Sequence, residues 1–150
     1  MSTPSSAPRL AVRSLSAGYP DRTVIEGLDL EFAPGRMTMI IGANASGKST
    51  LLGTLARLRA PLAGTVELDG ADVSQLARRA FAREVGLLPQ HPSAPDGITV
   101  AELVARGRHP HRGVFQRWSA ADSAIVDEAM ARTGVSDLAD RAVGGLSGGQ

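Results

Sequence analysis

Residues 42–49 limit the fold of this chain more than any other segment. They follow the pattern G-x-x-x-x-G-K-S, and they lie between a strand-like apolar run and a segment with helical spacing of leucines. Residues 37–41, just before them, form a short apolar run of the kind found in strands buried on both faces of a sheet. After them, residues 48–58 have helical spacing, with Leu51, Leu52, Leu55 and Leu58 on one face. A strand, a glycine-rich turn and a helix in this order predict an α/β fold.

A loop of this composition suits the phosphates of a nucleotide. Its glycines let several backbone N–H groups converge, and the start of the helix adds partial positive charge. Lys48 is the only lysine of the chain and would supply a full charge to the β and γ phosphates. The Ser49 hydroxyl would bind Mg²⁺. We therefore expect ATP and Mg²⁺ to bind at Gly42, Ala43, Asn44, Ala45, Ser46, Gly47, Lys48, Ser49 and Thr50.

The overall composition excludes several other kinds of site. The formal charge of +1 gives no electrostatic reason to expect nucleic acid as a partner. The absence of cysteine excludes disulfides, zinc–thiolate sites and cysteine nucleophiles. No apolar run approaches the roughly 20 residues that a membrane-spanning helix needs. The first residues lack the pattern of a signal peptide, and residues 1–9 are expected to form a disordered tail.

The remaining segments divide the chain into two parts. Strands are expected at 10–16, 28–32, 65–68 and 85–88, and helices at 74–81, 99–106, 119–133 and from Ser136. Thr99 and Glu102 match a capping box, and Ile125, Ala129 and Met130 would face inward on their helix. Because the later elements are all helical, we expect an α/β core over residues 10–90 and a helical part over residues 91–150.

The last five residues, Leu146-Ser147-Gly148-Gly149-Gln150, resemble the signature motif of ABC-type ATPases. Alone they could be a flexible Gly/Ser linker, but their distance from the phosphate loop is typical of that family. Gln90 follows an apolar run ending in Pro89 and is similar to the family's Q-loop glutamine. Tyr19 lies where the family has an aromatic residue that stacks on adenine. The resemblance covers residues 10–150.

This resemblance implies a P-loop NTPase fold, with a RecA-like core that has an antiparallel β edge and with a helical ABC subdomain. It implies catalytic roles for Lys48 and Gln90, with Gln90 also near Mg²⁺. The signature residues Leu146, Ser147, Gly148, Gly149 and Gln150 would contact ATP held by a second copy of the chain. Transmembrane permease subunits would be further partners, at the cytoplasmic face of the cell membrane.

Two more stretches, 104–111 and 118–122, resemble ATPases of iron–siderophore importers, whose close relatives import haem and cobalamin. The transported substrate implied is a ferric siderophore. His109 and His111 could suggest a metal site, but no third ligand is evident. We therefore expect these two histidines to be solvated or to contact a partner. His91 is expected to pack or hydrogen-bond locally.

After the signature motif, the family continues with a helix, an apolar strand ending in Asp-Glu, and a switch histidine. The sequence ends at Gln150, so it resembles a C-terminally incomplete chain. From this we expect residues 1–150 alone to hydrolyse ATP below a family-typical rate and to fold weakly.

Three alternatives remain open. A non-transport ABC-type ATPase of DNA repair or translation would carry coiled-coil or zinc insertions or a second cassette. A P-loop kinase would need a lid over its acceptor and would not explain residues 146–150. A truncated nucleotide-binding module would bind ATP or a partner without hydrolysis.

Overall fold

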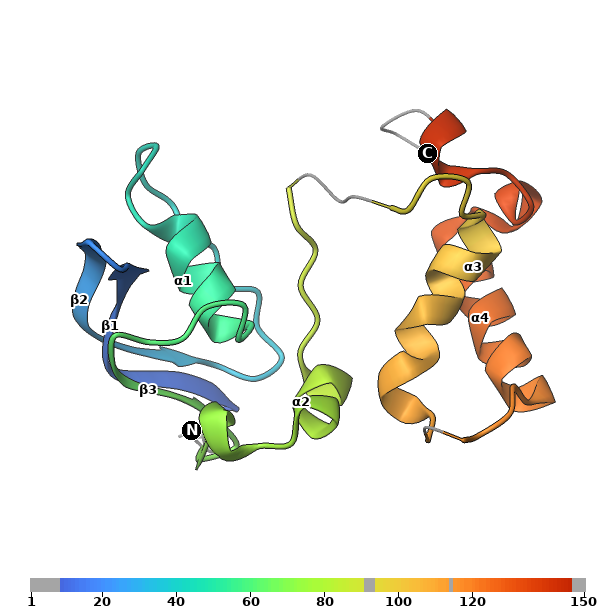
Figure 1. Ribbon diagram of the computed structural model, residues 1–150. Coiled ribbons are helices and arrows are strands. Elements are labelled where there is room, and N and C mark those ends of the chain that lie inside the picture. The colour runs from blue at the N-terminus through green and yellow to red at the C-terminus, as the bar shows by residue number, and fades with distance from the viewer. Residues whose placement is uncertain (1–8, 91–93, 114, 147–150) are drawn as a thin grey trace, which may run out of the picture. The chain divides into compact units, whose positions relative to one another are not determined.

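The computed structural model describes residues 9–90, 94–113 and 115–146, which form two compact units. The first unit ends at Gly86 and the second begins at Leu87. The strands described belong to the first unit, and the second unit is built from helices (Figure 1). None of the helices described is both long and apolar enough to cross a membrane.

The tail expected over residues 1–9 lies outside the described residues except for Arg9. For Arg9 the expectation is wrong, because its guanidinium donates to both carboxylate oxygens of Asp69, at 2.9 and 2.8 Å. It also donates to Glu84 at 3.0 Å. Residue 9 is therefore held against the first unit.

The first unit contains an antiparallel sheet with the strand order β2-β1-β3-β4. The strands are β1 (Leu10–Tyr19), β2 (Arg22–Phe32), β3 (Ala63–Leu68) and β4 (Ala71–Asp72). The expected strands 10–16, 28–32 and 65–68 are confirmed, and each is longer than expected. A tight turn at Pro20 and Asp21 joins β1 to β2, so that Tyr19 pairs with Arg22 and Gly18 with Thr23.

One face of this sheet packs against α1 (Lys48–Leu55). Val12, Leu15 and Val66 are fully or almost fully buried there, together with Leu51 and Leu55 of the helix. The helix is shorter than the expected 48–58, because the backbone turns left-handed soon after Leu55. Arg57 has φ 57°, a conformation that a right-handed helix cannot contain. Leu58 therefore lies beyond the helix and is exposed. Leu52 is exposed as well, although it lies within α1, so its expected place on the buried face is wrong.

Two expected buried strands are wrong. Residues 37–41 are coil, and three of their apolar side chains face solvent: Met37 is 90% exposed, Met39 70% and Ile41 83%. Only Ile40 is partly buried against the core of the first unit. Residues 85–88 are likewise coil, with Leu88 88% exposed. A strand requires a neighbour that pairs its backbone N–H and C=O groups, and the sheet described consists of β1 to β4 only.

The helix expected at 74–81 is divided in two. A 3₁₀ turn, η1 (Val73–Gln75), begins at Asp72, whose carboxylate accepts from the Ser74 N–H at 2.8 Å. The chain then becomes extended at Leu76 and Ala77 before α2 (Arg78–Glu84). Phe81 of α2 is buried and joins the core of the first unit.

The second unit contains α3 (Val100–Ala105), η2 (Arg106–His111), α4 (Ala120–Thr133), η3 (Ser136–Leu138) and η4 (Val143–Gly145). The capping box of Thr99 and Glu102 is confirmed at the start of α3. Val100, Val126 and Met130 form the buried core of this unit. The expected inward position of Met130 is confirmed, but that of Ile125 is wrong. Ile125 is exposed, and Val126, one position on, takes its place.

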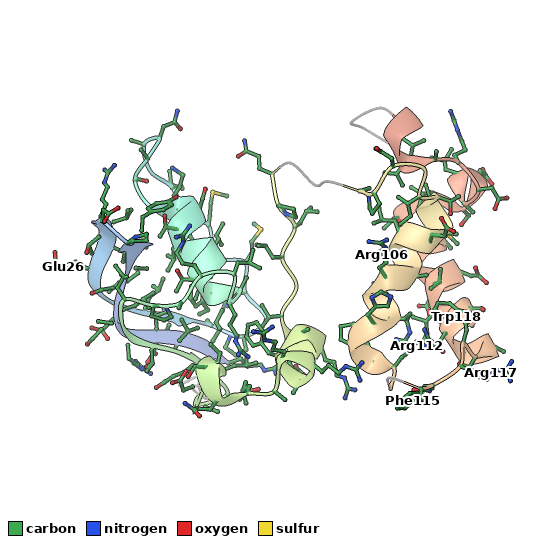
Figure 2. The ribbon with its side chains drawn as sticks, in the orientation of Figure 1. Glu26, Arg106, Arg112, Phe115, Arg117 and Trp118 are labelled. Carbon is green, nitrogen blue, oxygen red and sulfur yellow. The ribbon has the colours of Figure 1, made fainter. Side chains whose placement is uncertain are left out.

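A buried carboxylate organises the region before α4. Asp122 is 3% exposed and accepts from the Ser119 hydroxyl at 2.7 Å and from Arg108 Nε at 3.0 Å. Arg112 Nε lies 3.8 Å from the same carboxylate, and its guanidinium lies 5.0 Å from the centre of the Trp118 ring (Figure 2). The hydrogen bond from Ser119, with the smaller contribution of Arg108, lowers the pKa of Asp122 although burial opposes this.

Because the pKa of Asp122 is lower in the folded chain, its charge stabilises the fold above the pKa of the unfolded state. This stabilisation is lost as the pH falls through the folded-state pKa. We expect the free energy of unfolding of the second unit to decrease below about pH 4. In Asp122→Asn the free energy of unfolding should depend less on pH in this range, because an amide does not titrate.

Denaturant unfolding followed by tryptophan fluorescence at several pH values measures this effect, because Trp118 is the only tryptophan and lies in the second unit. Asp127→Asn, at an exposed position of the same helix, is the matched control. Its free energy of unfolding should depend on pH as steeply as that of the unmodified protein. An unchanged slope in Asp122→Asn would contradict the prediction.

Candidate nucleotide-binding site

The residue that joins the glycine-rich loop to α1 is Gly47, and its backbone conformation requires glycine. It has φ 93°, in the left-handed region. A Cβ added there would lie 3.0 Å from Val24 Cγ1 and 3.3 Å from Ile25 Cγ1, both in β2. The Gly47 carbonyl accepts from the Leu51 N–H at 2.8 Å, which starts the helix. The loop can therefore lie close against β2 only because Gly47 lacks a side chain.

The Lys48 side chain folds back over the loop that precedes it. Its ammonium donates to the carbonyls of Gly42 at 2.8 Å and Ala43 at 2.6 Å, and Ser46 Oγ lies at 3.3 Å. The loop itself turns at Ala45, which has φ 62°, and the Ser46 N–H donates to the Ala43 carbonyl. Lys48 thus places a positive charge at the loop, where an ammonium can donate equally well to phosphate oxygens.

Ser49 and Thr50 have different environments in the first turn of α1. Ser49 is exposed, so its hydroxyl is accessible to a ligand at the helix N-terminus. Thr50 is only 6% exposed and lies on the side of the helix that faces the core. The first turn of α1 contains no acidic side chain, so the partial positive charge of the helix N-terminus is not neutralised there.

Tyr19 lies at the end of β1 and is half-exposed. One face of its ring is covered by the guanidinium of Arg59, 4.2 Å from the ring centre. The hairpin that carries Tyr19 continues into β2, whose Val24 and Ile25 lie beside Gly47. The loop at Gly47 thus lies beside β2, the strand that pairs with the strand ending at Tyr19.

The other predicted site residues belong to the second unit. Gln90 is exposed, and Leu146 is partly buried against the core formed by Val100, Val126 and Met130. The predicted contacts of Ser147, Gly148, Gly149 and Gln150 lie outside the described residues, as does His91. His109 and His111 fall in η2, and the described residues contain no group of three or more His, Asp or Glu side chains that could hold a metal ion.

Sequence reasoning missed two features near the site. One is the packing of Gly47 on Val24 and Ile25, and the other is the contact of Arg59 with Tyr19. No local sequence pattern predicts either contact. Arg59 is separated from Tyr19 by 40 positions, and no spacing rule connects them.

The sequence matches the family model described as ABC transporter over residues 25–150. Among curated proteins, it is 49% identical over 145 residues to the ferric enterobactin transport ATP-binding protein of Escherichia coli, covering 97% of this chain and 54% of that protein. It is 47% identical over 138 residues to the achromobactin transport ATP-binding protein of Dickeya dadantii, covering 92% and 51%. The chain thus spans about half the length of the curated relatives it matches.

Its fold is similar to that of solved ABC transporter components. One of them, from Clostridium perfringens, is part of an ABC transporter complex. The two chains superpose with a TM-score of 0.74 at 25% identity, over 97% of this chain and 58% of that one. This similarity confirms the expected P-loop NTPase fold.

Proposed function

Because the chain belongs to the ABC transporter family, we propose that it is the ATP-binding subunit of an importer. The observation that carries this proposal is the loop at residues 42–49. There, Lys48 places its ammonium against the loop, and Gly47 holds the loop on β2 at the start of α1. A loop that holds this ammonium at the N-terminus of a helix favours a polyphosphate over a neutral ligand.

Within this site, each group has a separate task. Residues 42–47 would present backbone N–H groups to the phosphates, and Lys48 would donate to the β and γ phosphates. Tyr19 would stack on adenine with the ring face that Arg59 leaves open. Thr50 is buried, so we give its side chain no contact with the nucleotide. It contributes only to the first turn of α1, which carries Ser49.

The oxygen donors present are suited to Mg²⁺, which prefers oxygen ligands. Ser49 offers an exposed hydroxyl at the helix N-terminus, and Gln90 offers an exposed side-chain amide oxygen. We assign both as Mg²⁺ ligands in the complete protein. Bound Mg²⁺ would neutralise part of the phosphate charge.

The complete site would use a second copy of the chain. We assign Ser147 and Gly149 of that copy to the γ phosphate, with Leu146, Gly148 and Gln150 completing the same motif. Two ATP molecules would then hold two copies together, and hydrolysis would release them. Gln90 would link this cycle to permease subunits at the cytoplasmic face of the membrane.

The transported substrate we propose is a ferric siderophore. This choice is supported by the two relatives above, which are named for the transport of achromobactin and ferric enterobactin. Substitution of Lys48 by alanine in the native organism should strongly reduce uptake of radiolabelled ferric enterobactin, because the phosphates of ATP would lose the charged donor of the loop.

Arg79→Ala is the matched control for that uptake experiment, since Arg79 is an exposed cation on α2. It should leave uptake at the rate of the unmodified strain. Unchanged uptake in the Lys48→Ala strain would rule out ferric enterobactin as the substrate, and the same result with ferric achromobactin would contradict the siderophore proposal.

A further inference from the structure

We propose that Arg59 is a positioning residue for the nucleotide base, because it fixes the orientation of the Tyr19 ring. This inference rests on the proposed function, in which Tyr19 stacks on adenine. The Arg59 guanidinium lies 4.2 Å from the centre of the ring, well within the range of a cation–π contact. Through its NH1 group, Arg59 also donates to the Gly18 carbonyl at 2.9 Å.

The backbone that carries Arg59 is fixed independently of Tyr19. It belongs to the segment between α1 and β3, where the N–H groups of Leu58 and Arg59 both donate to the Gly53 carbonyl, at 2.8 and 3.2 Å. A few residues on, the Leu62 N–H donates to the Ser16 carbonyl of β1 at 2.8 Å. Since both ends of this segment are held by the backbone, Arg59 provides a fixed support for the ring.

The strand position next to Tyr19 is equally constrained. Gly18 is buried, and a Cβ added there would collide with the Arg22 carbonyl across the hairpin. The Gly18 carbonyl is therefore a fixed acceptor for Arg59. Two anchored points, one on β1 and one after α1, thus define where the guanidinium lies.

Tyr19 itself has only one face available for stacking. The ring is half-exposed, and the guanidinium covers the opposite face. A tyrosine that is already held in one orientation loses little conformational freedom when a base stacks on it, so more of the stacking energy appears as affinity. Arg59 therefore increases affinity for the base without contacting the nucleotide.

The test compares two ligands of the full-length protein in the presence of Mg²⁺: ATP, which has a base, and inorganic tripolyphosphate, which has none. Arg59→Met keeps the length of the side chain but removes the guanidinium. We expect it to raise the Kd for ATP by about 3- to 10-fold, which corresponds to the loss of a partly exposed cation–π contact. The Kd for tripolyphosphate should not change, and Arg59→Lys should restore part of the ATP affinity.

Arg57→Met is the matched control, because Arg57 makes a similar contact nearby with a different ring. Its guanidinium lies 5.2 Å from the centre of the Phe81 ring. Arg57→Met should leave the ratio of the two Kd values unchanged. Equal weakening of ATP and tripolyphosphate by Arg59→Met would overturn the inference, because it would show an effect on the phosphate loop or on the fold.

Tyr19→Ala separates this inference from the proposed function. If it weakens ATP binding, Arg59→Met combined with it should weaken binding no further. If Tyr19→Ala weakens ATP binding but Arg59→Met does not, the role of Arg59 is overturned and the proposed function stands. If Tyr19→Ala has no effect, the stacking role and the inference both fail. If the unmodified protein binds neither ligand, the proposed function fails.

Discussion

Replacement of Lys48 by alanine is expected to weaken the binding of ATP by about 100-fold, which is the effect of losing hydrogen bonds from a charged donor. Lys48 is the cation that reaches the carbonyls of Gly42 and Ala43, and it is the only lysine of the chain. The phosphates would keep the backbone N–H groups of the loop but lose the ammonium. Isothermal titration calorimetry with ATP and Mg²⁺ measures the change.

Two controls make this result specific. Arg79→Ala removes an exposed cation from α2 of the same unit and should leave ATP affinity unchanged. The melting temperature of Lys48→Ala should stay close to that of the unmodified protein, since the Lys48 contacts are exposed to solvent and contribute little to stability. Normal ATP affinity in Lys48→Ala would show that the loop at residues 42–49 is not the nucleotide site.

Asp122→Ala is expected to lower the melting temperature of the second unit by roughly 5–10 °C, the shift that follows from losing a helix cap and its buried contacts. Alanine removes the acceptor for the Ser119 backbone N–H and hydroxyl. It also leaves the partly buried guanidinium of Arg108 without its carboxylate. Trp118 fluorescence follows this melting directly, because Trp118 Nε1 donates to Ser123 Oγ of α4 at 2.7 Å.

Asp127→Ala provides the comparison, because Asp127 is an exposed aspartate of the same helix. Its melting temperature should remain near that of the unmodified protein. The melting temperature of Asp122→Asn should lie between those of Asp122→Ala and Asp127→Ala. The amide oxygen can still accept from Ser119, but the charge that pairs with Arg108 is gone. Equal melting temperatures for Asp122→Ala and Asp127→Ala would contradict the importance of the buried carboxylate.

Features that depend on a few neighbouring residues were predictable from the sequence. The capping box of Thr99 and Glu102 involves one turn of helix. The expected strand segments 28–32 and 65–68 show the alternating burial of half-buried strands. The strands expected at 37–41 and 85–88 failed for the opposite reason. An apolar run favours burial, but its conformation depends on whether another strand lies beside it, and local sequence does not contain that information.

The same difference applies to the candidate site. The loop could be located because all its groups lie within one short segment, whose glycines and lysine have clear chemical requirements. In the second unit, Ser119 and Asp122 form a capping box within one turn of α4, but Arg108, which donates to the same carboxylate, lies outside that helix. The contact of Arg59 with Tyr19 joins two segments through the folded sheet, so only the structure reveals it.

The packing of Gly47 on β2 restricts which substitutions this protein can accept in that strand during evolution. Val24 and Ile25 occupy the space that a side chain at position 47 would need, so neither can become larger without displacing the loop. Substitutions at positions 24 and 25 should therefore conserve volume even though neither residue touches the nucleotide in the proposed site. A survey of natural variation should find these two strand positions nearly as constrained in size as the glycine-rich loop is in identity.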